Sequence, residues 1–112
     1  MTTRASLRTG RDFARVYRAG RRARVDGITV WVAPAAEPGT TRVGLTVPGS
    51  VGGAVKRNRL RRRLREIVRS YGPVTGTDLV VRADRDAAGK NFQELHDVVS
   101  SALDGAGVGE DR

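Results

Sequence analysis

The strongest constraint on the fold is the stretch 54–71, which contains neither glycine nor proline. Apolar side chains recur in it at helical spacing, at Leu60, Leu64, Ile67, Val68 and Tyr71. The pattern predicts one long helix with a single apolar stripe for the core. Seven of the first thirteen residues are basic, so the docked helix must hold its positive charge away from the core.

Capping signals predict a helix at each end of the chain. The first begins after Thr9 and ends at Gly20, which we expect in a left-handed conformation. The last begins after Asn91, with Glu94 in the position that completes a capping box. In the first helix Phe13, Val16 and Tyr17 share one face, and in the last helix the predicted core-facing residues are Phe92, Leu95, Val98, Val99 and Ala102.

Three strands are predicted between these helices. The runs 28–32 and 42–47 alternate apolar with polar or small residues, so each predicts a half-buried strand, and we expect the two to pair antiparallel. The run 79–81 is wholly apolar, which indicates a buried strand. The predicted order is α, β, β, α, β, α in a single domain, 1–104, and the glycine-rich segment 105–112 is expected to be a flexible tail.

The chain is strongly basic, and its charge is unevenly distributed. Twenty-one Lys and Arg oppose twelve Asp and Glu, for a net charge of +9. Residues 1–72 hold seventeen bases and four acids, whereas residues 73–112 hold four bases and eight acids. This distribution indicates a protein that binds a polyanion with one part of its surface.

Composition also excludes several classes of protein. Cysteine is absent, so disulfide scaffolds, thiolate zinc sites and cysteine nucleophiles are excluded. No apolar run approaches the roughly 20 residues of a membrane-spanning helix, and the first 25 residues lack the apolar block of a signal peptide. We therefore expect a cytoplasmic protein without a membrane partner or a small-molecule substrate.

The basic part of the long helix is the leading candidate for nucleic-acid binding. Only Glu66 offers an ion-pair partner within it, whereas solvated helix faces normally intersperse acids with bases. Asn58 has two open interpretations: an amide that contacts a base edge, a 2′-hydroxyl or a metal-bound water, or a surface residue without a role. The candidate RNA-binding residues here are Lys56, Arg57, Asn58, Arg59, Arg61, Arg62 and Arg65.

A second candidate site is aromatic. Trp31 lies on the strand face opposite Ile28, Val30 and Val32, where the expected neighbouring strand presents only Gly44 and Thr46. Small residues around one large ring predict a groove in which bases of single-stranded nucleic acid can stack. Phe13 and Tyr17 line this groove if the first helix borders it; for Phe13, pinning the helix to the sheet is the open alternative. Basic residues flank this groove, and we interpret them as phosphate contacts or as a solvated edge; they are Arg15, Arg18, Arg21, Arg22 and Arg24.

No catalytic or metal-binding set is evident. His96 is the single histidine, and beside Asp97 it is expected to cap or to be solvated. Asp84 and Asp86 lack the ligand spacing of a known metal loop. We therefore expect no catalytic side chain and no protein-held metal ion.

Taken together, these segments resemble the protein subunit of bacterial ribonuclease P over about residues 6–102. The resemblance rests on Asp12-Phe13-x-x-Val16-Tyr17-x-x-Gly20, on Arg42-Val43-Gly44-Leu45-Thr46-Val47, on Ala54-Val55-x-Arg57-Asn58-Arg59 with Arg62 and Arg65-Glu66, and on Asp78-Leu79-Val80-Val81. The arginine-asparagine-arginine box is the most specific of these motifs.

The resemblance implies an α+β fold, a two-layer α/β sandwich of order α-β-β-(β)-α-β-α with a left-handed β-α-β crossover. It implies an RNA-binding subunit of the endoribonuclease that removes the 5′ leader of precursor tRNA by phosphodiester hydrolysis. The chemistry is expected on the catalytic RNA, with Mg²⁺ held mainly by RNA and its requirement lowered by the protein. The leader cleft is then expected to include Phe13, Tyr17, Trp31, Arg42 and Thr46, and the basic box to pack on the catalytic RNA.

Two departures from the family pattern concern the edge of this cleft. Pro48-Gly49-Ser50 stands where the family commonly has Ser-Lys-Lys, and Gly53 stands where an asparagine is usual. We expect weaker leader binding at that corner, offset in part by Lys56. Two other classes of protein remain as alternatives: a ribosomal or ribosome-assembly protein that binds RNA without catalysis, and a nuclease that acts without an RNA subunit.

Overall fold

The computed structural model describes residues 3–7, 9–37, 40–71 and 76–108. Its centre is a five-stranded mixed sheet of strand order β1-β4-β5-β3-β2. Parallel pairing joins β1 to β4 and β4 to β5, whereas β3 pairs antiparallel with both β5 and β2. The strands are β1 (Thr3–Ser6), β2 (Arg21–Val25), β3 (Ile28–Pro34), β4 (Thr40–Thr46) and β5 (Thr77–Ala83).

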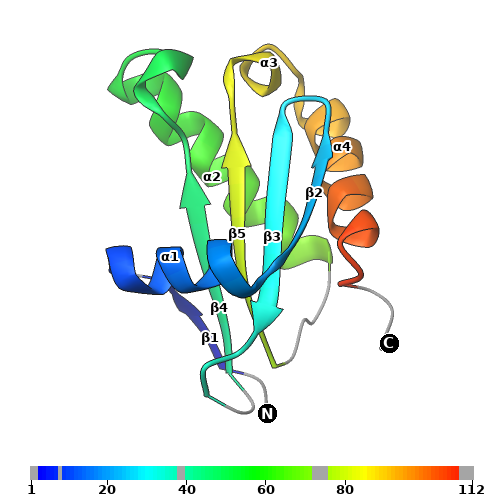
Figure 1. Cartoon of the computed structure of the whole chain (residues 1–112). Helices are drawn as coiled ribbons and strands as arrows, with labels where there is room; N and C mark the ends of the chain where they lie inside the picture. The colour runs from blue at the N-terminus through cyan, green and yellow to red at the C-terminus, as the bar shows by residue number, and fades with distance from the viewer. Residues whose placement is uncertain (1–2, 8, 38–39, 72–75, 109–112) are drawn as a thin grey trace.

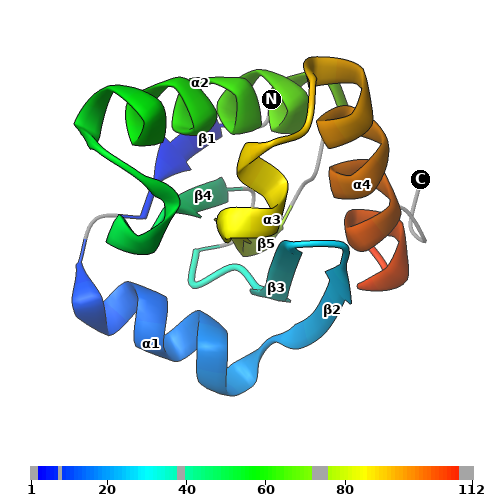
Figure 2. The ribbon, with the colours of Figure 1, turned by 90° about the horizontal axis from the view of Figure 1, so that it is seen from above.

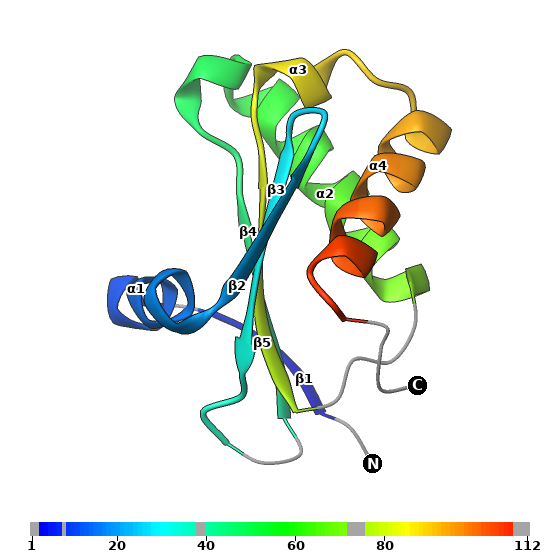
Figure 3. The same cartoon turned by 45° about the vertical axis from the view of Figure 1, so that its right-hand side comes forward.

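Helices cover both faces of the sheet. The helix α1 (Gly10–Ala19) crosses one face alone, whereas α2 (Ala54–Tyr71) and α4 (Phe92–Gly105) pack side by side on the other (Figures 1, 2 and 3). Short helical turns, η1 (Gly49–Val51) and α3 (Arg85–Ala88), lie at the end of the sheet where β4 and β5 finish. The face under α1 is called the α1 face below.

The connection from β4 through α2 to β5 is a left-handed crossover, as expected. In Figure 1 both strands point upward, β5 lies to the right of β4, and α2 lies behind the sheet. A right-handed crossover would place β5 on the other side of β4. Left-handed β-α-β units are rare in proteins, so this connection is a distinctive feature of the fold.

The expected pairing of 28–32 with 42–47 is wrong. The strands β3 and β4 run in opposite directions, but β5 lies between them and pairs with both. Leu79, Val80 and Val81 are fully buried, because a wholly apolar strand is stable only where both faces are covered. The sequence also did not indicate β1 and β2, which form the two edges of the sheet.

The start and end of α1 follow from local contacts. Thr9 caps the helix, its hydroxyl accepting a hydrogen bond from the Asp12 amide at 3.1 Å. Gly20 ends the helix as predicted, but with extended backbone (φ −88°) rather than in the left-handed region. Glycine is needed there for space: a Cβ would lie 2.5 Å from the Val16 carbonyl oxygen and 3.0 Å from that of Val32.

The helix α4 confirms the predicted capping box, with both Asn91–Glu94 hydrogen bonds present. Its core-facing residues include Leu95, Val99 and Ala102, but the prediction for Phe92 is wrong, because that ring is 42% exposed. The tail packs further than expected: α4 continues to Gly105 and Ala106 is buried. Residues 109–112 of the predicted tail lie outside the described residues.

Two apolar clusters hold the layers together. The larger one lies between the sheet and the helices α2 and α4 and contains the predicted helical stripe Leu60, Leu64, Ile67 and Val68. The smaller one lies on the α1 face, where Leu7, Val16, Ala33 and Val80 pack against Phe13 and Trp31. Gly44 provides the space for Phe13, since a Cβ there would lie 2.5 Å from the Phe13 ring.

We predict that Gly44→Val destabilises the fold by about 1–3 kcal/mol, because the added side chain overpacks the contact with Phe13. Urea unfolding measures the change. Gly10→Ala is the control, because that glycine begins α1 and has open space around its Cβ position. In a Phe13→Ala background the cost of Gly44→Val should fall; equal costs in both backgrounds would show that the two residues do not interact.

Candidate nucleic-acid interface

The α1 face is arranged in rows across neighbouring strands. Residues paired across a sheet point to the same side, so one row consists of Arg42, Asp78 and Ala33 and the next of Gly44, Val80, Trp31 and Arg22. A third row consists of Thr46, Arg82, Thr29 and Arg24. The helix α1 lies over the first two rows, since its Arg15 contacts Asp78 of the first row and its Phe13 ring lies against Gly44 of the second.

The three predicted aromatic residues come together on this face. The Tyr17 and Trp31 rings meet edge to face with centroids 4.7 Å apart, and the Phe13 and Tyr17 centroids are 6.3 Å apart. Tyr17 is 39% exposed and Trp31 is half-buried. The predicted empty groove beside Gly44 is not present, because the Phe13 ring fills that space. Phe13 therefore pins α1 to the sheet, and the Tyr17–Trp31 pair is the accessible aromatic surface.

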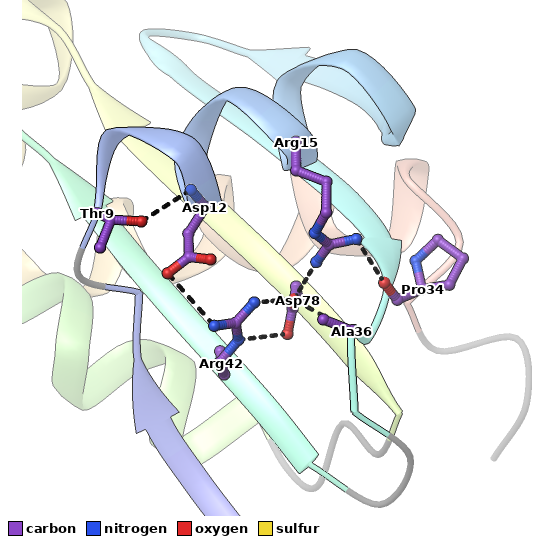
Figure 4. A network of polar contacts seen from close by, with 7 residues as sticks. All are labelled: Thr9, Asp12, Arg15, Pro34, Ala36, Arg42 and Asp78. Carbon is purple, nitrogen blue, oxygen red and sulfur yellow. Dashed lines mark hydrogen bonds and ion pairs between the residues drawn. The ribbon is translucent and has the colours of Figure 1, made fainter.

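A network of ion pairs ties α1 to the sheet (Figure 4). Its centre is the Asp78 carboxylate, which is completely buried and accepts hydrogen bonds from Arg15 of α1 and Arg42 of β4. Arg42 Nη2 lies 2.9 Å from Asp78 Oδ2, and Arg42 Nη1 lies 3.3 Å from Asp12 Oδ2. Arg15 also donates to the Pro34 carbonyl oxygen at 3.2 Å. Arg42, predicted to contact RNA, is thus held by two carboxylates of the protein.

These contacts shift two pKa values. Desolvation opposes ionisation of Asp12, but its hydrogen bonds with Thr9 and the charge of Arg42 outweigh it, so the pKa of Asp12 lies below the ordinary 3.8. The hydrogen bond to Asp78 raises the pKa of Arg42 further above its ordinary value, despite desolvation. Asp12 and Arg42 are therefore both charged at neutral pH.

The remaining flanking arginines differ in their surroundings. Arg24 forms an ion pair with Asp84 at 2.9 Å, and Arg21 packs against Gly107 near the end of α4. Arg18 and Arg22 are exposed. Thr46 is half-buried in the third row, at the end of β4. Sequence reasoning missed the role of Asp78, because a single acid before an apolar run gives no sign of its partners.

The basic helix α2 lies on the opposite side of the sheet from α1 (Figure 3). Asn58, Arg61, Arg62 and Arg65 share one face with Val55 and line an open hollow of about 470 Å³. Asn58 Oδ1 accepts a hydrogen bond from Arg61 Nη1 at 2.9 Å. The other predicted residues, Lys56, Arg57 and Arg59, lie outside this lining, although they belong to the first turns of α2.

The positive charge of α2 is almost unpaired. Among the described residues, α2 forms one ion pair, between Arg69 and Glu66 at 3.6 Å. The Nε atom of Arg57 is buried without a hydrogen-bond partner in the same part of the chain. A helix that docks by an apolar stripe and carries unpaired guanidinium groups is suited to bind phosphates.

The described residues contain no group of three or more His, Asp or Glu side chains that could hold a metal ion. The buried carboxylate of Asp78 is occupied by arginines. In the described parts of the chain, none of the helices combines the length and apolar character needed to span a bilayer.

The fold and these surfaces define a small basic α+β protein of the nucleic-acid-binding class. Residues 1–107 match the family model described as ribonuclease P. Similar relatives named "Ribonuclease P protein component" include one from Pseudarthrobacter chlorophenolicus, 36% identical over 93% of this chain and 78% of its own. Another, from Roseiflexus, is 40% identical over 91% of this chain and 85% of its own.

Solved structures of RNase P proteins have the same fold. The RNase P protein of Staphylococcus aureus has a TM-score of 0.85 at 24% identity and covers 92% of this chain and 95% of its own. That of Thermotoga maritima has a TM-score of 0.75 at 26% identity, covering 88% of this chain and 94% of its own. This chain belongs to the ribonuclease P protein family. It is therefore a protein component of a ribonuclease P endoribonuclease, with an RNA partner and a role in tRNA processing.

We predict that Asp78→Asn destabilises the protein by about 3 kcal/mol, because the substitution leaves Arg15 and Arg42 without their shared anion. This value lies at the low end for buried pairs, since both arginines keep some solvent contact. The matched control is Asp84→Asn: its partner Arg24 is largely exposed, and asparagine also caps α3. Urea unfolding should separate the two variants; equal small losses would contradict a central role for Asp78.

A second prediction concerns the stability of the fold at low pH. The pKa of Asp12 is lower in the folded protein than its ordinary value of 3.8, so the ionised carboxylate stabilises the fold. This stabilisation is fully present well above pH 3.8 and is lost as the pH falls through the folded pKa. Asp12→Asn should therefore be less stable than the parent at neutral pH, and the difference should shrink as pH falls below 3.8. Urea unfolding across this range measures it. A difference that does not change with pH would show that the Asp12 charge is not responsible.

Proposed function

We propose that this chain binds the single-stranded 5′ leader of precursor tRNA on the α1 face and the catalytic RNA subunit through α2. The observation that carries this proposal is the accessible Tyr17–Trp31 pair on one side of the sheet and the unpaired cations of α2 on the other. Aromatic rings give a sequence-tolerant surface for unpaired bases. Arginines on a rigid helix suit the phosphates of a folded RNA.

Electrostatics supports a role in assembly. A catalytic RNA and its precursor substrate are both polyanions and repel each other. The protein carries thirteen positive charges in excess over residues 1–72, so its binding should lower this repulsion and hence the concentration of magnesium needed. This argument favours a positioning subunit over a nuclease that acts alone, for which the described residues offer no acid–base pair around a common point.

The chemistry is then hydrolysis of the phosphodiester at the 5′ end of the mature tRNA, on the catalytic RNA and not on protein side chains. The described carboxylates do not fit a resident magnesium site, so we assign Mg²⁺ mainly to RNA phosphates. Removal of leaders from precursor tRNA places the protein in the bacterial cytoplasm. The family membership favours this role over that of a ribosomal protein.

Reconstitution tests the proposal. The purified chain, the catalytic RNA and a precursor tRNA are combined at low magnesium, and each component is omitted in turn. Cleavage should need both macromolecules, and affinity for the leader-bearing substrate should fall with log salt at a slope of about −0.7 per single-strand phosphate contact. Cleavage by the protein without RNA, or affinity that ignores salt, would refute the proposal.

We predict that Trp31→Ala weakens the binding of precursor tRNA by about 1–3 kcal/mol and leaves that of mature tRNA unchanged, because only the precursor has a leader to stack on the ring. Equilibrium binding of both tRNAs to the reconstituted holoenzyme measures the difference. Phe92→Ala is the matched control, since that ring is exposed on α4, on the other side of the sheet. Equal losses for both tRNAs would place Trp31 in a purely structural role.

A further inference from the structure

The ion pairs on the α1 face separate its strand arginines into two groups. Arg42 is held by Asp78 and Asp12, and Arg24 is held by Asp84. Arg22 and Arg82 are exposed, and within the described segments neither forms an ion pair. The acids on this face thus pair with Arg15 of α1 and with two of the four strand arginines, and the other two strand arginines remain available for an external anion.

Arg82 has an unusual position for an unpaired charge. It lies on β5, the central strand, and its neighbours across the sheet are Thr46 on β4 and Thr29 on β3. Thr29 is buried and accepts a hydrogen bond from Arg24. An arginine rooted in the middle of a sheet starts from a rigid backbone, so it loses less entropy on binding than an arginine in a loop.

Both free arginines adjoin Trp31. Arg22 is its direct partner across the β2–β3 pair, where Cβ atoms lie about 5 Å apart, and Arg82 is its diagonal neighbour across β3–β5, about 7–8 Å away. The two arginines are therefore on opposite sides of the indole, on the strands that flank β3. The exposed Tyr17 ring meets the same indole from α1.

We propose that Arg82 and Arg22 bind the two phosphates that flank a leader nucleotide whose base stacks on the Tyr17–Trp31 pair. This inference rests on the proposed function and names the charged contacts of the same surface. Guanidinium groups bind phosphate through paired, charge-assisted hydrogen bonds. Two cations on either side of an aromatic ring match the order phosphate, base, phosphate along an unpaired strand.

The arrangement also explains why Arg42 is a poor candidate for this contact. Moving its guanidinium to an RNA phosphate would break contacts with two carboxylates, one of them completely buried. Arg82 and Arg22 contact no carboxylate of the described residues, so their gain on binding phosphate is not offset by the loss of such a contact.

The test compares holoenzymes reconstituted with Arg82→Gln, Arg22→Gln and the double variant. Each single substitution should weaken the binding of leader-bearing precursor tRNA roughly ten- to a hundredfold, the size expected of a charge-assisted hydrogen bond. It should also make the slope of log affinity against log salt shallower by about 0.7. Mature tRNA should bind as before. Arg82→Lys should keep the salt slope while losing part of the affinity, because the charge stays but the paired geometry does not.

Arg69→Gln is the control for net charge. It removes one positive charge from the carboxyl end of α2, on the opposite side of the sheet, and should leave the preference for precursor over mature tRNA unchanged. Circular dichroism and urea unfolding verify that all variants are folded to the same extent.

The possible outcomes distinguish this inference from the function on which it rests. If the parent holoenzyme prefers leader-bearing substrate but the Arg82 and Arg22 variants behave like Arg69→Gln, the inference is wrong and the proposed function stands. If these variants weaken both tRNAs equally, the arginines contact the catalytic RNA, which also overturns the inference. If the parent itself shows no preference for leader-bearing substrate, the proposed function is wrong, and the inference that rests on it is overturned with it.

Discussion

The arrangement of the α1 face depends on one buried carboxylate. Asp78 lies on the central strand and is shared by an arginine from α1 and an arginine from β4. These contacts place α1 across the sheet, where Phe13 fills the space over Gly44 and Tyr17 meets Trp31. An unpaired buried charge is costly. The ion pairs at Asp78 therefore stabilise the packing of α1, β4 and β5 against one another. The same contacts remove Arg42 from the set of cations that an RNA can use.

The thickness of one sheet separates the two surfaces that we propose to bind RNA. On one side a small apolar cluster and the aromatic pair lie beside free arginines, and on the other α2 holds its cations away from the main core. The left-handed crossover from β4 to β5 puts α2 on the side opposite α1. A rigid sheet between the two surfaces suits a subunit that holds a substrate strand at a fixed position relative to a folded RNA.

Local patterns predicted the helices well and the sheet poorly. The bounds of α2, the cap at Thr9 and the box at Asn91 each depend on residues within one or two turns, so the sequence displays them directly. The pairing of 28–32 with 42–47 was wrong, because strand order depends on contacts distant in sequence, here the insertion of β5. Phe92 was misplaced because a residue in the first turn of a helix can fit the periodicity and still lie beyond the edge of the core.

Some features of the candidate site can likewise be predicted from the sequence, whereas others depend on the fold. Sequence by itself determined its chemical composition: the unpaired cations of one helix, the few aromatic residues, and the family motifs that connect them. Tertiary structure decided which of these groups can act. Asp78 and Asp12 pair with Arg15 and Arg42, and Asp84 pairs with Arg24. The register of β2, β3 and β5 brings Arg22 and Arg82 to either side of Trp31. The physical reason is that a charge is available to a ligand only when no nearer counter-charge holds it, and that distance is set by the packing of strands far apart in the chain.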